Sequence, residues 1–86
     1  MMNRKMLKQA QELQKQMLQV QQEVESSSVE ATSGGGVVTV RVTGKMTLES
    51  LKISKDVVDP EDLEMLEDLV QAAINEGLSK AQQMAS

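Results

Sequence analysis

The sequence predicts an α+β fold in which one long helix precedes a small antiparallel sheet along the chain and a second long helix follows it. Apolar residues recur at steps of three and four over the first 25 residues, alternate with polar residues between residues 38 and 43, and return to helical spacing after residue 62. With 86 residues, the chain is long enough for one domain only, which we assign to residues 1–86.

Residues 1–25 predict a basic amphipathic helix, rich in the strong helix formers Gln, Glu, Lys and Leu. One of its faces carries apolar side chains at steps of 4, 3, 4, 3 and 4, the a/d pattern of helices that pack lengthwise. We call these residues the apolar seam: Met6, Ala10, Leu13, Met17, Val20 and Val24. The pattern leaves open whether the seam packs on a partner subunit or on the sheet or last helix of its own chain.

Positive charge lies on the opposite side of this helix. At about 100° per residue, Arg4, Lys8 and Lys15 fall within about 40° of one another, with Lys5 at their flank. We call these four residues the basic stripe. Such a stripe can neutralise nucleic-acid phosphates, but most charged helix faces are simply solvated, so the stripe alone leaves both interpretations open. Because the chain has no aromatic residue to stack on bases, contact with a duplex backbone is the favoured form of nucleic-acid binding.

Residues 28–54 predict a three-stranded sheet. The serine run at 26–28 disfavours continuation of the helix, because serine hydroxyls compete for backbone hydrogen bonds, and a short strand fits residues 29–32. The next strand alternates apolar and polar residues, which is typical of a half-buried strand. Its core-facing residues are Val38, Val40 and Val42.

The third run, residues 46–54, follows a predicted hairpin turn. Gly44-Lys45 between two strands predicts a type II′ turn. The apolar residues of the third run change face at Glu49-Ser50, which predicts a β-bulge. The bulge would keep two apolar pairs on the core side: Met46 with Leu48, and Leu51 with Ile53.

Residues 60–85 predict an acidic amphipathic helix. Asp59 is the expected N-cap and Pro60 the first helical residue. The acidic residues around Pro60 are explained better by capping of the helix N-terminus than by a metal site, because the calcium-loop pattern is absent. The apolar stripe comprises Leu63, Leu66, Val70, Ala73, Ile74, Gly77, Ala81 and Met84. Because Gly77 costs about 1 kcal/mol in helix propensity, we expect another backbone to pack close to it.

The glycine run at 34–36 raises the alternative of a phosphate-binding loop. Such a loop needs a strand before the glycines and Gly-Lys-[Ser/Thr] at the start of a helix. Here the glycines precede a strand, and Met46 follows Lys45. We therefore interpret the glycines as a hinge and Gly44-Lys45 as a hairpin turn.

The composition excludes several classes of protein. Cys and His are absent, which removes the usual nucleophile–base pairs and most transition-metal sites, so we expect no enzyme, metal, cofactor or small-molecule substrate.

Without disulfide or metal, a chain this short is expected to gain stability by oligomerisation. No apolar run approaches the roughly 18 residues of a membrane span, and no apolar segment follows the basic start as in a secretory signal. We expect a cytoplasmic protein.

Charge is distributed unevenly along the chain. The net charge is −4, which by itself argues against nucleic-acid binding. However, residues 1–22 and 37–55 each carry +3, whereas residues 23–36 carry −3 and residues 56–86 carry −7. The basic segments remain candidates for an acidic partner, and the acidic last helix is a candidate for docking on a basic protein.

Three segments resemble the YbaB/EbfC family of bacterial nucleoid-associated proteins. They are MLKQAQELQKQMLQVQQEVE, GGGVVTVRVTG and, most specifically, VVDPEDLEMLEDLVQAAINEGLSKAQQM. The likeness extends over nearly the whole chain, from Met6 to Met84.

The resemblance implies a homodimer of α-β-β-β-α subunits, with the sheets packed at the dimer core and helical arms projecting. It also implies binding to double-stranded DNA with little sequence preference, and a role in nucleoid organisation and gene expression. Because DNA contact in the family is associated with the arms, the implied DNA-binding residues are Arg4, Lys5, Lys8 and Lys15, with Lys80 as a further candidate. The apolar seam and the three valines are the expected core or dimer contacts. The alternative function is a dimeric helical adaptor that binds another protein through Leu7, Leu18 and the Gln-rich surface.

Overall fold

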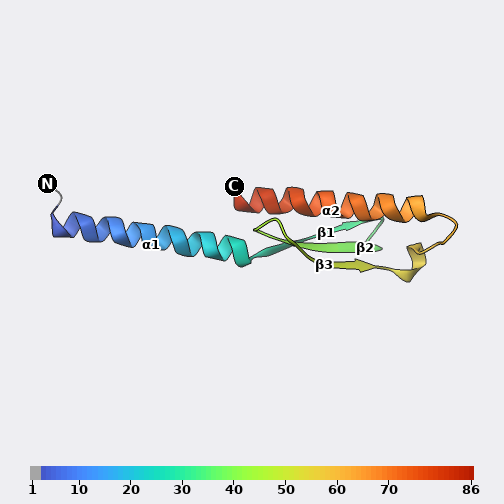
Figure 1. Ribbon diagram of the computed structural model, residues 1–86, viewed down its shortest axis with the longest axis horizontal. Helices are drawn as coiled ribbons and strands as arrows, with labels where there is room; N and C mark the ends of the chain where they lie inside the picture. The colour runs from blue at the N-terminus through green and yellow to red at the C-terminus, as the bar shows by residue number, and fades with distance from the viewer. Residues whose placement is uncertain (1–2) are drawn as a thin grey trace.

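The computed structural model describes residues 3–86 and shows a helix, a three-stranded antiparallel sheet and a second helix (Figure 1). The predicted α+β class and the order α-β-β-β-α are confirmed. The elements are α1 (Arg4–Ser26), β1 (Ser28–Ser33), β2 (Val38–Thr43), β3 (Leu48–Ile53), the short 3-10 helix η1 (Lys55–Val57) and α2 (Leu63–Ala85).

The subunit is far longer than it is wide. Its extents are 73 × 16 × 16 Å and its radius of gyration is 20.0 Å, whereas a compact chain of this length has a radius of gyration of about 12 Å. The reason is that α1 projects from the sheet as an arm, while α2 lies along the sheet (Figure 1).

Polar side chains define both ends of α1. The Asn3 side chain accepts a hydrogen bond from the Met6 amide at 2.8 Å and caps the first turn. At the other end, the Ser27 amide donates to the carbonyl oxygens of Glu23 and Val24, at 3.0 and 3.2 Å. The helix therefore stops within the serine run, as predicted.

The sheet has the strand order β1-β2-β3, and β2 supplies most of its buried side chains. Val38, Val40 and Val42 are fully buried in the hydrophobic core of the subunit. α2 covers β1 and β2 with its small residues Ala73, Gly77 and Ala81.

Gly77 is close to side chains rather than to another backbone. A Cβ placed on Gly77 would lie 2.8 Å from Val42 Cγ2 and 3.0 Å from Val40 Cγ2. The expected approach of a second backbone is therefore wrong: the glycine lets α2 sit directly on the valines of β2.

The β-bulge is confirmed in the pairing of β2 with β3. Arg41 pairs with Ser50, and Val42 pairs with Leu48, so Glu49 is the extra residue. The bulge turns the apolar residues of β3 toward the same side of the sheet as the buried valines. However, α2 does not extend over β3, and these residues remain about 40% exposed. We call them the apolar shelf: Leu48, Leu51 and Ile53.

The predicted type II′ turn is wrong. Residues 44–46 form a three-residue loop in which Met46 has a φ of 65° and its amide donates to the Thr43 carbonyl at 2.9 Å. A type II′ turn would require a positive φ at Gly44, which is not present. Gly44 is needed for space instead, because a Cβ there would overlap the Val24 carbonyl of α1. Met46 consequently lies in the loop, exposed, and not on the core face.

α2 begins three residues later than predicted. Its N-cap is Asp62, whose side chain accepts from the Met65 amide at 3.2 Å. Asp59 instead caps the preceding turn, accepting from the Glu61 amide at 3.0 Å. Asp62 has a φ of −138° and a ψ of 63°, which is not helical, so the turn at Pro60 does not continue into the helix. Leu63 is consequently exposed and outside the packed stripe.

Candidate nucleic-acid interface

The basic stripe lies on the projecting arm. No residue of α1 is buried, and all four cations of the stripe are exposed. Within residues 3–86, the ion pairs are Arg41 with Glu30 and Lys45 with Glu25, so the stripe's charges have no acidic partner there. The stripe therefore presents four exposed cations to a ligand, and the one acid among residues 3–22 is Glu12, four residues from Lys8 and three from Lys15.

Helix geometry sets the spacing of these charges. At a rise of 1.5 Å per residue, Arg4 and Lys8 lie about 6 Å apart along the axis, and Lys15 lies about 10 Å further on. A row of cations at this spacing can contact several phosphates of one nucleic-acid backbone, and such contacts carry no sequence information directly.

Among residues 3–86, most of the apolar seam is not covered by the rest of the subunit. From Met6 to Val20 its residues are exposed, and only Val24, next to the body, is half-buried. Packing of the seam on its own sheet or last helix, one of the two alternatives, is therefore not what the structure shows. The seam and the basic stripe occupy opposite sides of the arm.

Lys80 lies apart from the other predicted cations. It belongs to α2, and its ammonium donates to the Glu30 carbonyl oxygen on β1 at 3.2 Å. Arg4, Lys8 and Lys15 instead lie along the arm. The structure thus brings together the four residues of the stripe and leaves Lys80 on the body.

The acidic residues are concentrated away from the arm. The N-terminal half of α2 and the turn that precedes it lie at the end of the molecule opposite α1 (Figure 1). This region carries Glu61, Asp62, Glu64, Glu67 and Asp68. The uneven charge of the sequence therefore becomes a spatial separation between the outer part of the arm, where residues 3–22 carry +3, and an acidic region at the far end of the body.

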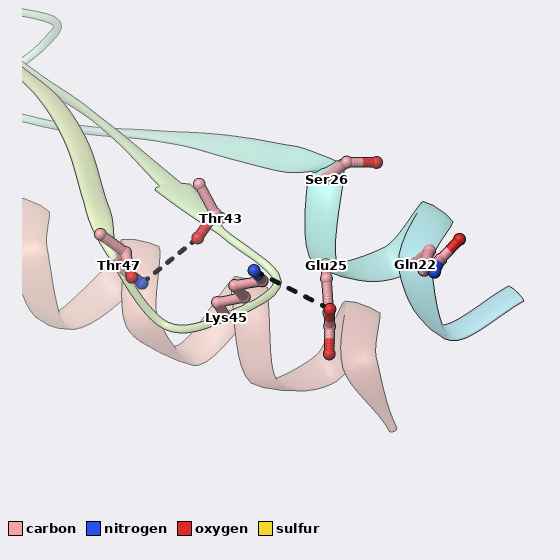
Figure 2. A pocket seen from close by; sticks show the side chains of 6 residues that line it. All are labelled: Gln22, Glu25, Ser26, Thr43, Lys45 and Thr47. Carbon is pink, nitrogen blue, oxygen red and sulfur yellow. Dashed lines mark hydrogen bonds and ion pairs between the residues drawn. The ribbon is translucent and has the colours of Figure 1, made fainter. Parts of the chain in front are cut away.

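A hollow that the sequence did not predict lies where the arm meets the body (Figure 2). It has a volume of about 400 Å³. Its lining comprises Gln22, Glu25 and Ser26 from α1, and Thr43, Lys45 and Thr47 from the β2–β3 hairpin. The nearest ion pair joins Lys45 Nζ to Glu25 Oε2 at 4.0 Å. No local pattern places the hairpin loop beside the end of α1, so only the folded chain reveals this site.

Across residues 3–86, His, Cys, Asp and Glu side chains form no group of three or more that could hold a metal ion. In the same part of the chain, neither helix combines the length and the apolar character needed to cross a membrane.

Comparison with known proteins agrees with this geometry. The model of the YbaB/EbfC DNA-binding family matches residues 1–86. A nucleoid-associated protein of Alkaliphilus metalliredigens is 49% identical over 81 residues, covering 94% of this chain and 71% of that protein. One from Chloroflexus aurantiacus is 47% identical over 85 residues, covering 99% of this chain and 85% of that protein.

A solved structure shares the fold. The crystal structure of the uncharacterised protein HP0035 from Helicobacter pylori superimposes with a TM-score of 0.68 at 24% identity, covering 86% of each chain. With a family match along the entire sequence and relatives at nearly half identity, the chain belongs to the YbaB/EbfC DNA-binding family.

Proposed function

We propose that this protein binds the backbone of double-stranded DNA through the basic stripe of α1, and that it is a cytoplasmic, nucleoid-associated protein. The observation that carries the proposal is a row of four exposed cations, none of them in an ion pair within residues 3–86, on an arm that projects from the body. Membership of a DNA-binding family and the names of the bacterial relatives support it. Its role is to bind and organise DNA and so influence gene expression, not to catalyse a reaction.

Binding of this kind shows little sequence preference. Lysine and arginine neutralise phosphates and release counterions, a contribution that is the same for every duplex. The chain has no aromatic residue for base stacking, and the stripe offers only four cations along one helix face. Recognition therefore depends on the charge and shape of the backbone.

The DNA-binding unit that we propose is a homodimer. The apolar shelf on β3 and the apolar seam on α1 are both uncovered in the subunit. Most helical stability in proteins comes from packing of an amphipathic face, yet the 23-residue α1 has no buried side chain in the subunit. A second copy packed on the shelf, and along the seam near the body, would cover these surfaces. It would also provide a second basic stripe, and the linked stripes would bind with higher avidity.

Fluorescence anisotropy of a labelled duplex, titrated with protein from low to moderate salt, tests the DNA site. We expect affinity to fall steeply with salt and an unrelated duplex to compete equally. Replacing Lys8 and Lys15 with Ala should weaken binding to all duplexes and reduce the salt slope by about 0.9 for each lost contact. A matched control is the Lys52→Ala/Lys55→Ala pair, which removes the same charge from the body.

Two results would contradict this assignment. If Arg4, Lys5, Lys8 and Lys15 all become Ala and affinity is unchanged, DNA binds elsewhere. If the unchanged protein binds no duplex even at low salt, the adaptor function takes precedence, because Leu7 and Leu18 are about half exposed on the arm. A protein partner would then be retained after nuclease treatment.

A further inference from the structure

The hollow at the base of the arm is aligned with the basic stripe. At about 100° per residue, Gln22 falls at the same angle around α1 as Arg4, and Ser26 falls within about 40° of both. Gln22 and Ser26 also line the hollow. The hollow therefore opens on the face of the arm that carries the stripe.

The β2–β3 loop adds a cation to this face. Lys45 reaches into the hollow from the loop (Figure 2). The loop is held against the arm, because the Gly44 amide donates to the Ser27 carbonyl at 3.0 Å and there is no room for a Cβ beside the Val24 carbonyl. The position of Lys45 is thus coupled to the end of α1, although the two are far apart in sequence.

The ammonium of Lys45 is only loosely held. Its side chain is 65% exposed, and Glu25, at 4.0 Å, is its acidic partner within residues 3–86. Exposed ion pairs of this kind contribute about 0.2–1 kcal/mol. At 4.0 Å the two groups are too far apart for a hydrogen bond, whereas a phosphate oxygen that approaches the ammonium closely makes a charge-assisted hydrogen bond with it. Glu25 can therefore be displaced by a phosphate at little cost.

The length of the arm fits a duplex that reaches the hollow. Arg4 and Ser26 lie about 33 Å apart along the helix axis, so a duplex that lies along the stripe face of the whole arm also reaches the hollow. Hydroxyl and amide groups also contribute phosphate contacts in protein–DNA complexes, and Gln22, Ser26 and Thr43 supply such groups in the hollow.

We propose that Lys45 is a further DNA-contacting residue, which binds a backbone phosphate in the hollow, and that Glu25 competes with the DNA for its ammonium. This inference rests on the DNA binding proposed for the basic stripe. It extends the interface from the arm onto the sheet and makes Glu25 an attenuator of affinity.

The test compares Lys45→Gln, Glu25→Gln, their combination and Lys55→Gln in the same anisotropy titration. Lys55→Gln is the matched control, because Lys55 is an exposed lysine in η1, beyond β3 from the loop. We expect Lys45→Gln to weaken binding and to reduce the salt slope by about 0.9 per bound protomer, and Lys45→Arg to retain both. Glu25→Gln should tighten binding by about 1.4- to 5-fold, and by less when Lys45 is already Gln.

Each contrary outcome has a separate meaning. If Lys45→Gln behaves like Lys55→Gln while the stripe variant loses binding, Lys45 is not a contact and the proposed function stands. If the stripe variant keeps full affinity, the proposed function fails, whatever Lys45 does. If Glu25→Gln has the same effect with and without Lys45, the competition is overturned. Far-UV circular dichroism of each variant verifies that it is folded.

Discussion

At the scale of single residues, stability depends on a few small side chains. Among the described residues, the fully buried apolar set is limited to Ala31, Val38, Val40, Val42, Ala73 and Ala81. None of these side chains is larger than valine, so α2 can approach β2 closely, and each methyl group in the contact matters. Substitutions here should act on folding and leave the arm's charges untouched.

Val40→Ala should destabilise the protein by about 2 kcal/mol, because it removes two buried methyl groups and leaves a cavity under α2. Urea denaturation at a fixed protein concentration measures the effect. Thr39→Ala, on the opposite face of the same strand, is the control and should cost much less. Equal losses for the two variants would contradict the assignment of faces on β2.

Gly77→Ala should also destabilise the protein, by about 1 kcal/mol. The added methyl would lie within 3.0 Å of valine side chains on β2, and such overpacking costs more than the gain in helix propensity. The control is Asn75→Ala, on the exposed side of α2, which changes helix propensity without adding a contact to the sheet. Its melting temperature in thermal unfolding should rise. A rise in the melting temperature of Gly77→Ala would mean that α2 sits further from the sheet.

At the scale of elements, the two helices differ in what holds them. α2 is packed on β1 and β2, so the loss of its N-cap should lower the free energy of unfolding of the whole subunit. α1 contacts the rest of the subunit only near its C-terminal end (Figure 1). A lost cap at Asn3 would therefore fray the tip of the arm with little effect on global unfolding.

The start of α2 can be tested by replacing each candidate cap. Asp62→Ala should lower the free energy of unfolding by about 1 kcal/mol, because the Met65 amide loses its partner at the helix N-terminus. Asp59→Ala should cost less, since Asp59 supports only the turn before the helix. Chemical denaturation of the two variants measures the difference. A larger loss for Asp59→Ala would favour the earlier helix start that the sequence predicted.

Local patterns predicted most of these elements. The helices, the valine strand and the bulge at Glu49 follow from spacing, which the backbone geometry of each element imposes. The start of α2 differs from the predicted one because Asp59 and Asp62 are equally good caps, and only the chain path after Pro60 selects between them. The role of Gly44 was misjudged because the constraint comes from Val24, twenty residues away.

The candidate site was predictable in part. The angular positions of Arg4, Lys8 and Lys15 need only a helix, so the sequence sufficed to place them on one face. An a/d pattern is the same for internal and external partners, so it does not determine whether the apolar seam is covered within the chain. The contribution of Lys45 required knowing which helix end the β2–β3 loop touches, which is a property of the tertiary fold.

At the scale of the whole molecule, the uncovered apolar shelf predicts the assembly state. Leu51→Lys places a charge in the middle of the shelf and should convert the proposed homodimer into a monomer, as measured by sedimentation equilibrium. DNA affinity should fall as well, because the two basic stripes are no longer linked. Thr39→Lys adds the same charge to the other face of the sheet and should remain dimeric. A dimeric Leu51→Lys protein would exclude the shelf as the interface.

The separation of charge along the 73 Å subunit explains how an acidic chain can approach DNA. The Debye length at physiological ionic strength is about 8 Å, whereas Lys15 lies about 16 Å along the helix from the base of the arm. A duplex at the arm tip is therefore screened from the acids on α2, and the net charge of −4 does not describe the field that it meets. One practical consequence concerns chromatography: the same protein, at one pH, should be retained both by an anion exchanger, through its body, and by a cation exchanger, through its arm.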